Sequence, residues 1–275
     1  MAATEATFTG KGGLSIFYRA WQPEGTPRGV VVICHGVNSH GGQYIWAAER
    51  LVESGFAVFA LDLRGRGRSE GRRFFVTDAA DYASDVAGTI AIAKAAYPGL
   101  KLFLLGHSAG GVTSTIYTLD HQAEIDGFIC ESFAYQVPAP AFALAIIKFL
   151  GGIFPKLPVL KLKNKDFSRD PAWVAALDAD PYTQNETQPA ATVRALLIAG
   201  ERMKVEFPTI TIPLLIMHGT QDKATVPAGS IFFHKTAGSA DKTLKLYEGH
   251  YHDLLADLGK ESVMGDITAW IEARL

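Results

Sequence analysis

A short apolar stretch that runs directly into the pattern Gly-x-Ser-x-Gly constrains the fold of this chain more than any other feature. Leu102–Leu105 reads as a buried strand, Gly106–Gly110 carries the pattern, and the residues that follow to Leu119 read as a helix. A strand-to-helix turn this sharp places Ser108 at a strained, exposed apex, with glycines beside it because a Cβ there would clash. An ordinary serine in a glycine-rich turn is the alternative, but the flanking strand and helix favour a nucleophile.

Composition limits what such a chain can do. Its 275 residues are 48% hydrophobic and 20% charged, which suits one α/β domain with a large core. The formal net charge is −2 and no basic run occurs, which excludes a nucleic-acid-binding surface. Cys34 and Cys130 lie in apolar runs, and we expect buried free thiols in a reducing compartment.

The segments that could direct the chain to a membrane or out of the cell do not have the required pattern. The N-terminal residues lack a basic and an apolar region in sequence, and the lipophilic segment Ala139–Phe154 is short and interrupted by Lys148 and two glycines. We therefore expect a cytoplasmic protein, a monomer or a homodimer, that is compatible with transient contact with a membrane surface.

Short runs rich in Val, Ile, Leu and Phe alternate with longer helical patterns. Strands that are apolar on both faces and separated by helices are typical of a parallel sheet covered on both sides. An antiparallel edge is expected at Leu14–Trp21. The expected parallel strands are Val30–Cys34, Phe56–Leu61, Lys101–Leu105, Ile125–Cys130, Pro213–His218 and Thr243–Tyr247, and the expected helices are Tyr44–Ser54, Ala79–Tyr97, Gly111–His121, Ala228–Thr236 and Lys260–Leu275.

This alternation stops between about Phe133 and Thr209, where proline-punctuated helical patches replace buried strands. We therefore divide the chain into a core, residues 1–132 and 210–275, and a helical insertion, residues 133–209. Ala141–Leu150 is apolar nearly all round, which is typical of a buried core helix. Its place after the sixth strand favours the alternative, a lid over a lipophilic cleft.

A serine nucleophile needs a base and an acid that orients the base, and in folds with this turn they follow in the order Ser, acid, His. Asp222 follows one expected strand and the pair His250 and His252 follows the next. Both loops then open at the carboxyl ends of their strands, on the same side as Ser108. Sequence alone does not choose between the two histidines. Glu131 competes with Asp222, but we expect it at the hinge of the insertion.

Two backbone amides are candidates for the oxyanion hole. Ala109 begins the helix after the nucleophile, and Val37 follows a strand end where Gly36 allows the backbone to turn. Each such donor is worth roughly 3 kcal/mol of barrier reduction. His35 is expected to orient this loop, and Asp253 reads as a solvated turn residue.

Several further motifs appear in a fixed order, and together they resemble one family. Over nearly its whole length the chain resembles the monoglyceride lipase and lysophospholipase-like branch of the α/β-hydrolase superfamily. The resemblance implies an α/β-hydrolase fold with a mostly parallel twisted sheet flanked by helices, and no metal or organic cofactor. The motifs are His35-Gly36, Asp62–Gly71, Gly106–Gly111, Ser168–Pro171 with Asp180-Pro181, His218–Asp222 and Tyr247–His252.

The resemblance also assigns roles to residues. The family pattern Gly-x-Tyr-His supplies the base, so His252 is implied, and the triad becomes Ser108, Asp222 and His252, with Val37 and Ala109 as the oxyanion hole. The implied reaction is hydrolysis of carboxylic esters of medium or long acyl chains, as in monoacylglycerol lipases, through an acyl-enzyme. Candidate walls for the acyl chain lie on the lid, namely Phe142, Leu144, Ile146, Ile147, Phe149 and Leu150.

The chain also departs from the family pattern. Ser39 and Gln43 stand where typical members have Glu and Arg, and Leu255 stands where some have another histidine. The identity of the alcohol is therefore left open. The alternatives are a carboxylesterase, lysophospholipase, thioesterase or aminopeptidase on the same fold, or a non-catalytic ligand receptor.

Overall fold

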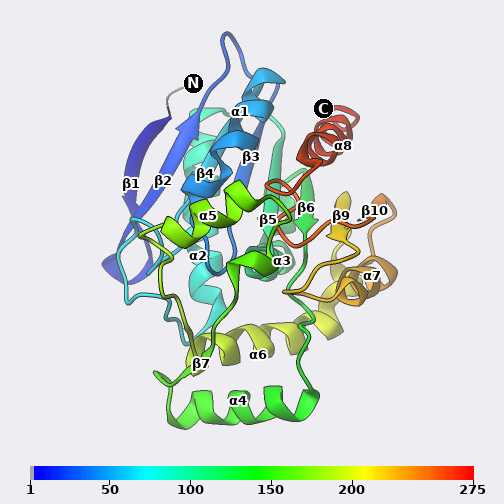
Figure 1. The fold of residues 1–275 in the computed structure, drawn as a ribbon. Helices are drawn as coiled ribbons and strands as arrows, with labels where there is room; N and C mark the ends of the chain where they lie inside the picture. The colour runs from blue at the N-terminus through cyan, green and yellow to red at the C-terminus, as the bar shows by residue number, and fades with distance from the viewer. Residues whose placement is uncertain (1–2) are drawn as a thin grey trace.

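One eight-stranded sheet forms the centre of the computed structural model, which describes residues 3–275 (Figure 1). The strand order is β1-β2-β4-β3-β5-β6-β9-β10. β1 pairs antiparallel with β2 and β2 antiparallel with β4, and every later pair is parallel. The strands are β1(Thr4–Thr9), β2(Ser15–Trp21), β3(Gly29–Cys34), β4(Phe56–Leu61), β5(Leu102–His107), β6(Gly127–Glu131), β9(Leu214–Gly219) and β10(Lys242–Tyr247).

The sequence analysis placed the antiparallel edge at β2, whereas the edge strand is β1. β1 has the sequence Thr-Glu-Ala-Thr-Phe-Thr and is largely exposed, so it lacks the apolar run that marks the other strands. All six parallel strands that we expected are present. The fold is therefore the expected one, with an additional strand at its edge.

Helices cover both faces of the sheet and define two apolar layers. Alternate side chains of β3 enter different layers, because Val30 and Val32 face one side while Val31 and Ile33 face the other. Both cysteines are buried and free. The helices of the core are α1(Ile45–Glu53) and α8(Lys260–Glu272) on one face, and α2(Ala79–Ala96), α3(Ala109–His121) and α7(Pro227–Thr236) on the other.

The insertion between β6 and β9 contains three α-helices, α4(Ala141–Ile153), α5(Pro171–Ala179) and α6(Ala190–Glu206). α6 packs on α3 of the core, and α4 packs on α6 at a greater distance from the sheet (Figure 1). The insertion also holds two short strands that we did not expect, β7(Pro158–Leu160) and β8(Gln188–Pro189), which pair antiparallel.

α4 is not a core helix, although its sequence is apolar nearly all round. Gly151 is its only buried residue, and a Cβ at that position would lie 2.5 Å from the carbonyl oxygen of Ala190 on α6. The remaining apolar side chains are partly or largely exposed. Within residues 3–275 no helix combines the length and apolar character needed to cross a bilayer.

Candidate active site

Ser108 lies at the turn between β5 and α3, in the strained backbone conformation that the sequence predicts. Its φ is 56° and its ψ is −120°, which a residue with a side chain rarely adopts. Neighbouring glycines allow the turn, since a Cβ on Gly106 would lie 2.5 Å from Ser114 Oγ and one on Gly110 would lie 2.3 Å from the carbonyl oxygen of Cys34. Ser108 is buried from bulk solvent but lines a large open cavity. The strained strand-to-helix turn at Ser108 is confirmed, whereas the exposure expected for Ser108 is limited to that cavity.

Asp222 and His252 meet where the loops after β9 and β10 lie side by side. Oδ2 of Asp222 lies 2.7 Å from Nδ1 of His252, and the side chain of Asp222 is fully buried. Oδ1 of Asp222 accepts hydrogen bonds from the amides of Ala224 and Thr225, at 2.7 and 2.9 Å. The carboxylate is thus fixed by the loop that follows it, and its contact with Nδ1 leaves Nε2 as the other nitrogen of the His252 ring.

The attraction between the carboxylate of Asp222 and a protonated His252 counteracts the loss of solvation on burial. Burial favours the neutral carboxylic acid, but the charge of His252 and the hydrogen bonds from His218 and His252 outweigh it and hold the pKa of Asp222 far below its usual range. Burial likewise opposes protonation of His252, but Asp222 raises the pKa of this histidine above its ordinary value. Asp222 therefore stays ionised and stabilises a protonated His252.

Two partners of Asp222 were missed in the sequence. Nε2 of His218, at the end of β9, lies 3.1 Å from Oδ2 of Asp222, and Thr225 Oγ1 donates to the same oxygen at 2.7 Å. The opposite nitrogen of His218 contacts Ser230 Oγ of α7 at 2.7 Å. His218 belongs to a motif that we singled out, but only the folded loop shows that it contacts the acid.

Val37 and Ala109 come together with Ser108 at one end of the large cavity, which all three residues line. Among the described residues, neither backbone amide has a hydrogen-bond acceptor. A Cβ on Gly36 would lie 2.9 Å from Cβ of Ser108, so this loop contacts the nucleophile turn directly. Two unpaired amides beside the serine are what an oxyanion hole requires.

The large cavity has a volume of about 2550 Å³, including solvent at its mouth, and lies between the nucleophile turn and helices α4 and α6. Of the lid residues predicted to form acyl-chain walls, Leu144, Ile147 and Phe149 line this cavity. Phe142 and Ile146 do not line it and are 70% and 53% exposed; Leu150 does not line it either. The helical period directs these three side chains away from the cavity. Because α4 is apolar on all sides, its sequence does not indicate which of its faces lines the cavity.

The competing candidates have other roles. Glu131 accepts a hydrogen bond from the amide of Leu255 at 3.2 Å and makes none with His252. Nδ1 of His250 lies 3.7 Å from Asp257 rather than next to Asp222. Nδ1 of His35 donates to the carbonyl oxygen of Gly36 at 2.7 Å and its Nε2 accepts from the amide of Leu63 at 2.9 Å, which confirms its role in orienting the loop.

Asp253 is the clear error of the sequence analysis, since it is partly buried rather than a solvated turn residue. Its Oδ2 accepts a hydrogen bond from Nε1 of Trp173 on α5 at 3.0 Å, and its Oδ1 lies 3.4 Å from Nε2 of His107. The insertion covers this loop through Trp173, and the sequence around Asp253 does not indicate that contact.

His107, His252 and Asp253 also form a group of metal-ligand type whose ligand atoms lie within 4.8 Å of one another.

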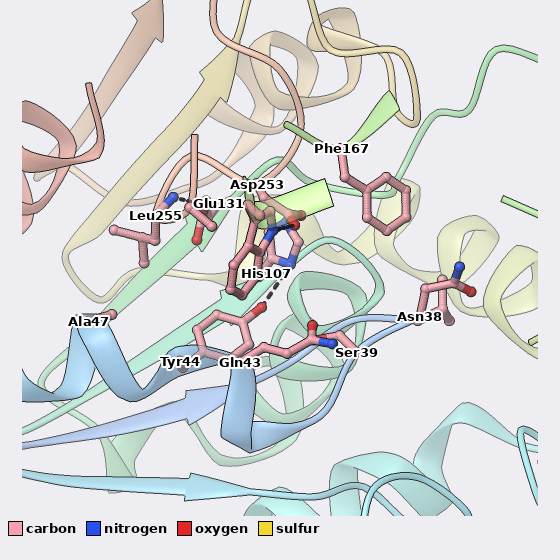
Figure 2. A pocket seen from close by; sticks show the side chains of 13 residues that line it. Asn38, Ser39, Gln43, Tyr44, Ala47, His107, Glu131, Phe167, Asp253 and Leu255 are labelled. Carbon is pink, nitrogen blue, oxygen red and sulfur yellow. Dashed lines mark hydrogen bonds and ion pairs between the residues drawn. The ribbon is translucent and has the colours of Figure 1, made fainter. Parts of the chain in front are cut away.

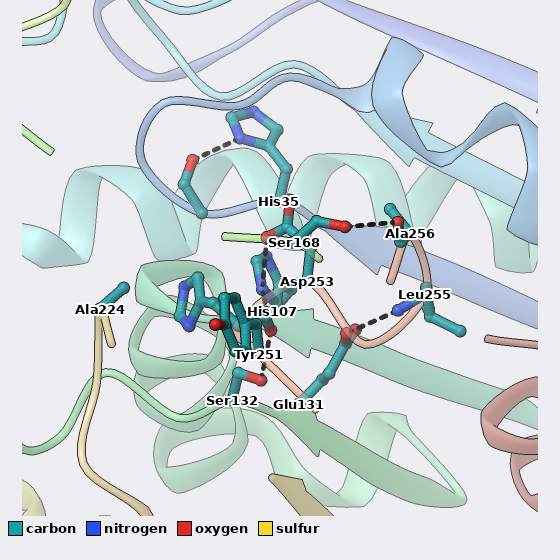
Figure 3. Close-up of polar contacts among 12 residues, drawn as sticks. His35, His107, Glu131, Ser132, Ser168, Ala224, Tyr251, Asp253, Leu255 and Ala256 are labelled. Carbon is teal, nitrogen blue, oxygen red and sulfur yellow. Dashed lines mark hydrogen bonds and ion pairs between the residues drawn. The ribbon is translucent and has the colours of Figure 1, made fainter. Parts of the chain in front are cut away.

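The insertion is attached to the loop of His252 by a second set of contacts (Figure 3). The amide of Asp253 donates to the carbonyl oxygen of Phe167 at 2.8 Å, and Ser168 Oγ donates to the carbonyl oxygen of Ala256 at 3.0 Å. Arg169 Nε donates to Oδ2 of the buried Asp257 at 2.8 Å. This part of the insertion is therefore tied to the core, in contrast to the exposed α4.

A second, smaller cavity of about 390 Å³, including solvent at its mouth, shares Val37 with the large cavity. Figure 2 shows residues that line the smaller cavity. His107 lies at its edge, with Nδ1 2.8 Å from the hydroxyl of Tyr44. Burial, together with the charge of His252, lowers the pKa of His107 to about 3, so its ring stays neutral. Ser39 and Gln43 line this cavity too, which places the departures from the family pattern there.

Comparisons with known proteins agree with this fold. The family described as serine aminopeptidase, S33, matches residues 25–259. Monoacylglycerol lipase of Mycolicibacterium smegmatis is 36% identical over 99% of this chain and 98% of its own length, and human monoglyceride lipase is 32% identical over 95% and 88%. The crystal structure of Paleococcus ferrophilus monoacylglycerol lipase has a TM-score of 0.83 at 30% identity, with both chains fully covered. The chain therefore belongs to the serine aminopeptidase S33 family of α/β-hydrolases, with monoglyceride lipases among its relatives.

Proposed function

We propose that Ser108, Asp222 and His252 are the catalytic triad of this carboxylic ester hydrolase, and that its substrates are esters of medium and long acyl chains, monoacylglycerols among them. The observation that carries the proposal is the pairing of Asp222 Oδ2 with His252 Nδ1 at 2.7 Å. The ring of His252 also lies 4.8 Å, between centroids, from that of His107, which directly precedes Ser108 in its strained turn. The monoacylglycerol and monoglyceride lipases among its relatives support the substrate class.

The reaction follows from the roles of these groups. His252 Nε2 takes the proton of Ser108 as its oxygen attacks the ester carbonyl, and the Val37 and Ala109 amides stabilise the oxyanion. The alcohol leaves with the proton from His252. Water then attacks the acyl-enzyme, again with His252 as base, and releases the fatty acid.

The large cavity is proposed to hold the acyl chain, and residues 133–209 to form its lid. Leu144 and Ile147 give it an apolar wall on α4. Burying a methylene group is worth about 0.8 kcal/mol, so longer chains gain binding energy until the cavity is full.

The outer face of α4 is proposed to make transient contact with a lipid surface, from which the substrate enters. Phe142, Ile146 and Ile153 are exposed there, and Lys156 follows the helix. Apolar side chains with nearby lysines favour binding at an interface with anionic lipid. The buried thiols of Cys34 and Cys130 are consistent with a cytoplasmic protein, working as a monomer or a homodimer.

A hydrolysis panel with monoacylglycerol, lysophospholipid, triacylglycerol and short synthetic esters tests the substrate class. We expect monoacylglycerol turnover, and p-nitrophenyl esters to react faster as the acyl chain lengthens from acetate. A steady decrease from acetate onward would contradict the proposed acyl site. Ser108→Ala should abolish both turnover and labelling by a fluorophosphonate, while Ser262→Ala, at an exposed serine of α8, should change neither.

A further inference from the structure

The smaller cavity contains a carboxyl group that lacks a partner. Glu131 is 1% exposed and lines this cavity. One of its oxygens accepts the hydrogen bond from Leu255, and the other, Oε2, has no hydrogen-bond partner among the described residues. An unpaired polar atom is costly in a buried site, so its persistence at a cavity wall indicates a ligand.

A second acid, Asp253, lines the same cavity, and no lysine or arginine does. Burial and the charge of Asp253 raise the pKa of Glu131 to about 8, while burial raises that of Asp253 to about 6. Each acid would ionise more readily if a positive charge lay between them. The cavity therefore has the lining that a bound cation requires.

Aromatic rings complete the lining and indicate which kind of cation fits. Tyr44, Phe167 and Trp173 line the cavity together with the two acids. Figure 2 shows Tyr44 and Phe167 in this lining. Aromatic faces attract ammonium groups and are the usual walls of sites for quaternary ammonium, whereas they offer no ligand atoms to a metal ion. An organic ammonium group suits this combination best.

The cavity also lies where a leaving alcohol would go. It shares Val37, a proposed oxyanion donor, with the acyl cavity, and the ring of Phe167 lies 5.2 Å from that of His252. Resting on the proposed function, we propose that this cavity binds the positively charged end of the leaving alcohol, so that the enzyme prefers esters of ammonium alcohols to neutral esters of the same shape. The bonds made and broken stay those of ester hydrolysis.

A pair of substrates of equal shape tests this preference. The decanoyl ester of choline and that of 3,3-dimethylbutanol differ only in replacing a quaternary nitrogen by carbon. We expect kcat/KM for the choline ester to exceed that for the neutral ester by roughly tenfold or more, as a desolvated ammonium–aromatic contact allows. Equal values, or a preference for the neutral ester, would overturn the proposal.

Variants identify the source of the preference. Glu131→Gln and Asp253→Asn should each reduce the ratio of the two kcat/KM values severalfold, and because it is a ratio, partial loss of folded enzyme does not alter it. Glu261→Gln, at an exposed acid of α8, should leave the ratio and the activity unchanged. A ratio that survives both cavity variants would contradict the assignment.

Binding can also be measured without turnover. With Ser108→Ala protein, choline should raise the melting temperature more than 3,3-dimethylbutanol at equal concentration, and Glu131→Gln should remove that difference. If neither ester nor any p-nitrophenyl ester is hydrolysed but choline still binds, the proposed function fails and the cation site stands. If neutral esters are hydrolysed and choline neither binds nor is preferred as an ester, only the cation site fails.

Discussion

Asp222 and His252 are 30 residues apart in the sequence, yet Oδ2 of the acid lies 2.7 Å from Nδ1 of the histidine. The parallel pairing of β9 with β10 brings them together, because it places the loops after both strands at the same edge of the sheet. The carboxylate of Asp222 is also held by the backbone amides of Ala224 and Thr225. The hydroxyl of Thr225 and Nε2 of His218 contact its Oδ2.

Asp222→Asn should therefore reduce kcat by about 10⁴-fold at neutral pH, because an amide stabilises the wrong tautomer of His252 and cannot balance its positive charge. Thr225→Val removes one hydrogen bond to the same oxygen and should cost far less. Initial rates on a p-nitrophenyl ester measure both. An Asp222→Asn enzyme with a tenth of the original kcat would show that another group orients the base.

Much of this site was predictable because it depends on local patterns. The strand–turn–helix around Ser108 and the loops after β9 and β10 can be read from short segments of sequence. Partners such as Thr225 and Trp173 could not be predicted, since they depend on how distant loops fold over the site. β1 was missed for a related reason, as its alternating polar residues carry too little apolar signal.

Gly36 should be intolerant of a side chain because of its contact with the nucleophile turn. A Cβ there would lie 2.9 Å from Cβ of Ser108 and 3.1 Å from the carbonyl oxygen of His107. Gly36→Ala should lower kcat by about 100-fold or more, the scale of losing one oxyanion donor. Gly265→Ala is the control, since nothing lies within 4 Å of the added Cβ. Equal rates for the two variants would contradict the close packing.

Filling the acyl cavity should shorten the preferred acyl chain. Ile147 lines the cavity, so Ile147→Trp should reduce kcat/KM for long p-nitrophenyl esters while leaving the acetate and butyrate nearly unchanged. Phe142 points away from the cavity and is 70% exposed, so Phe142→Trp should leave the chain-length profile as it is. If both variants shift the profile equally, the two faces of α4 do not differ in their contact with substrate.

Glu131 should make the protein less stable as the pH rises. Its pKa is about 8 in the folded protein, against an ordinary value of 4.5, so above pH 4.5 the unfolded chain releases a proton that the folded protein retains. That difference favours unfolding by an amount that grows up to about pH 8, on the order of a few kcal/mol at 1.4 kcal/mol per pKa unit. Glu131→Gln should therefore raise the melting temperature at pH 8 relative to the original chain more than it does at pH 5. A stability gain that does not vary with pH would show that Glu131 is not held neutral.

Arg169 is predicted to position the catalytic loop from the insertion. Its backbone amide and Nε both donate to the buried Asp257, at 2.7 and 2.8 Å, and Asp257 in turn accepts from the amide of Tyr251, next to His252. Arg169→Ala should lower kcat by about tenfold with little change in KM, because the substrate cavity stays intact while His252 is held less firmly. Arg169→Lys preserves the charge and should recover part of the rate.

Arg28→Ala, which breaks an exposed ion pair with Glu272, is the matched control and should leave kcat unchanged. The rate of inactivation by a fluorophosphonate gives an independent measure of how well Ser108 is activated, and a normal rate in Arg169→Ala would mean that Asp257 fixes the loop without help from the insertion.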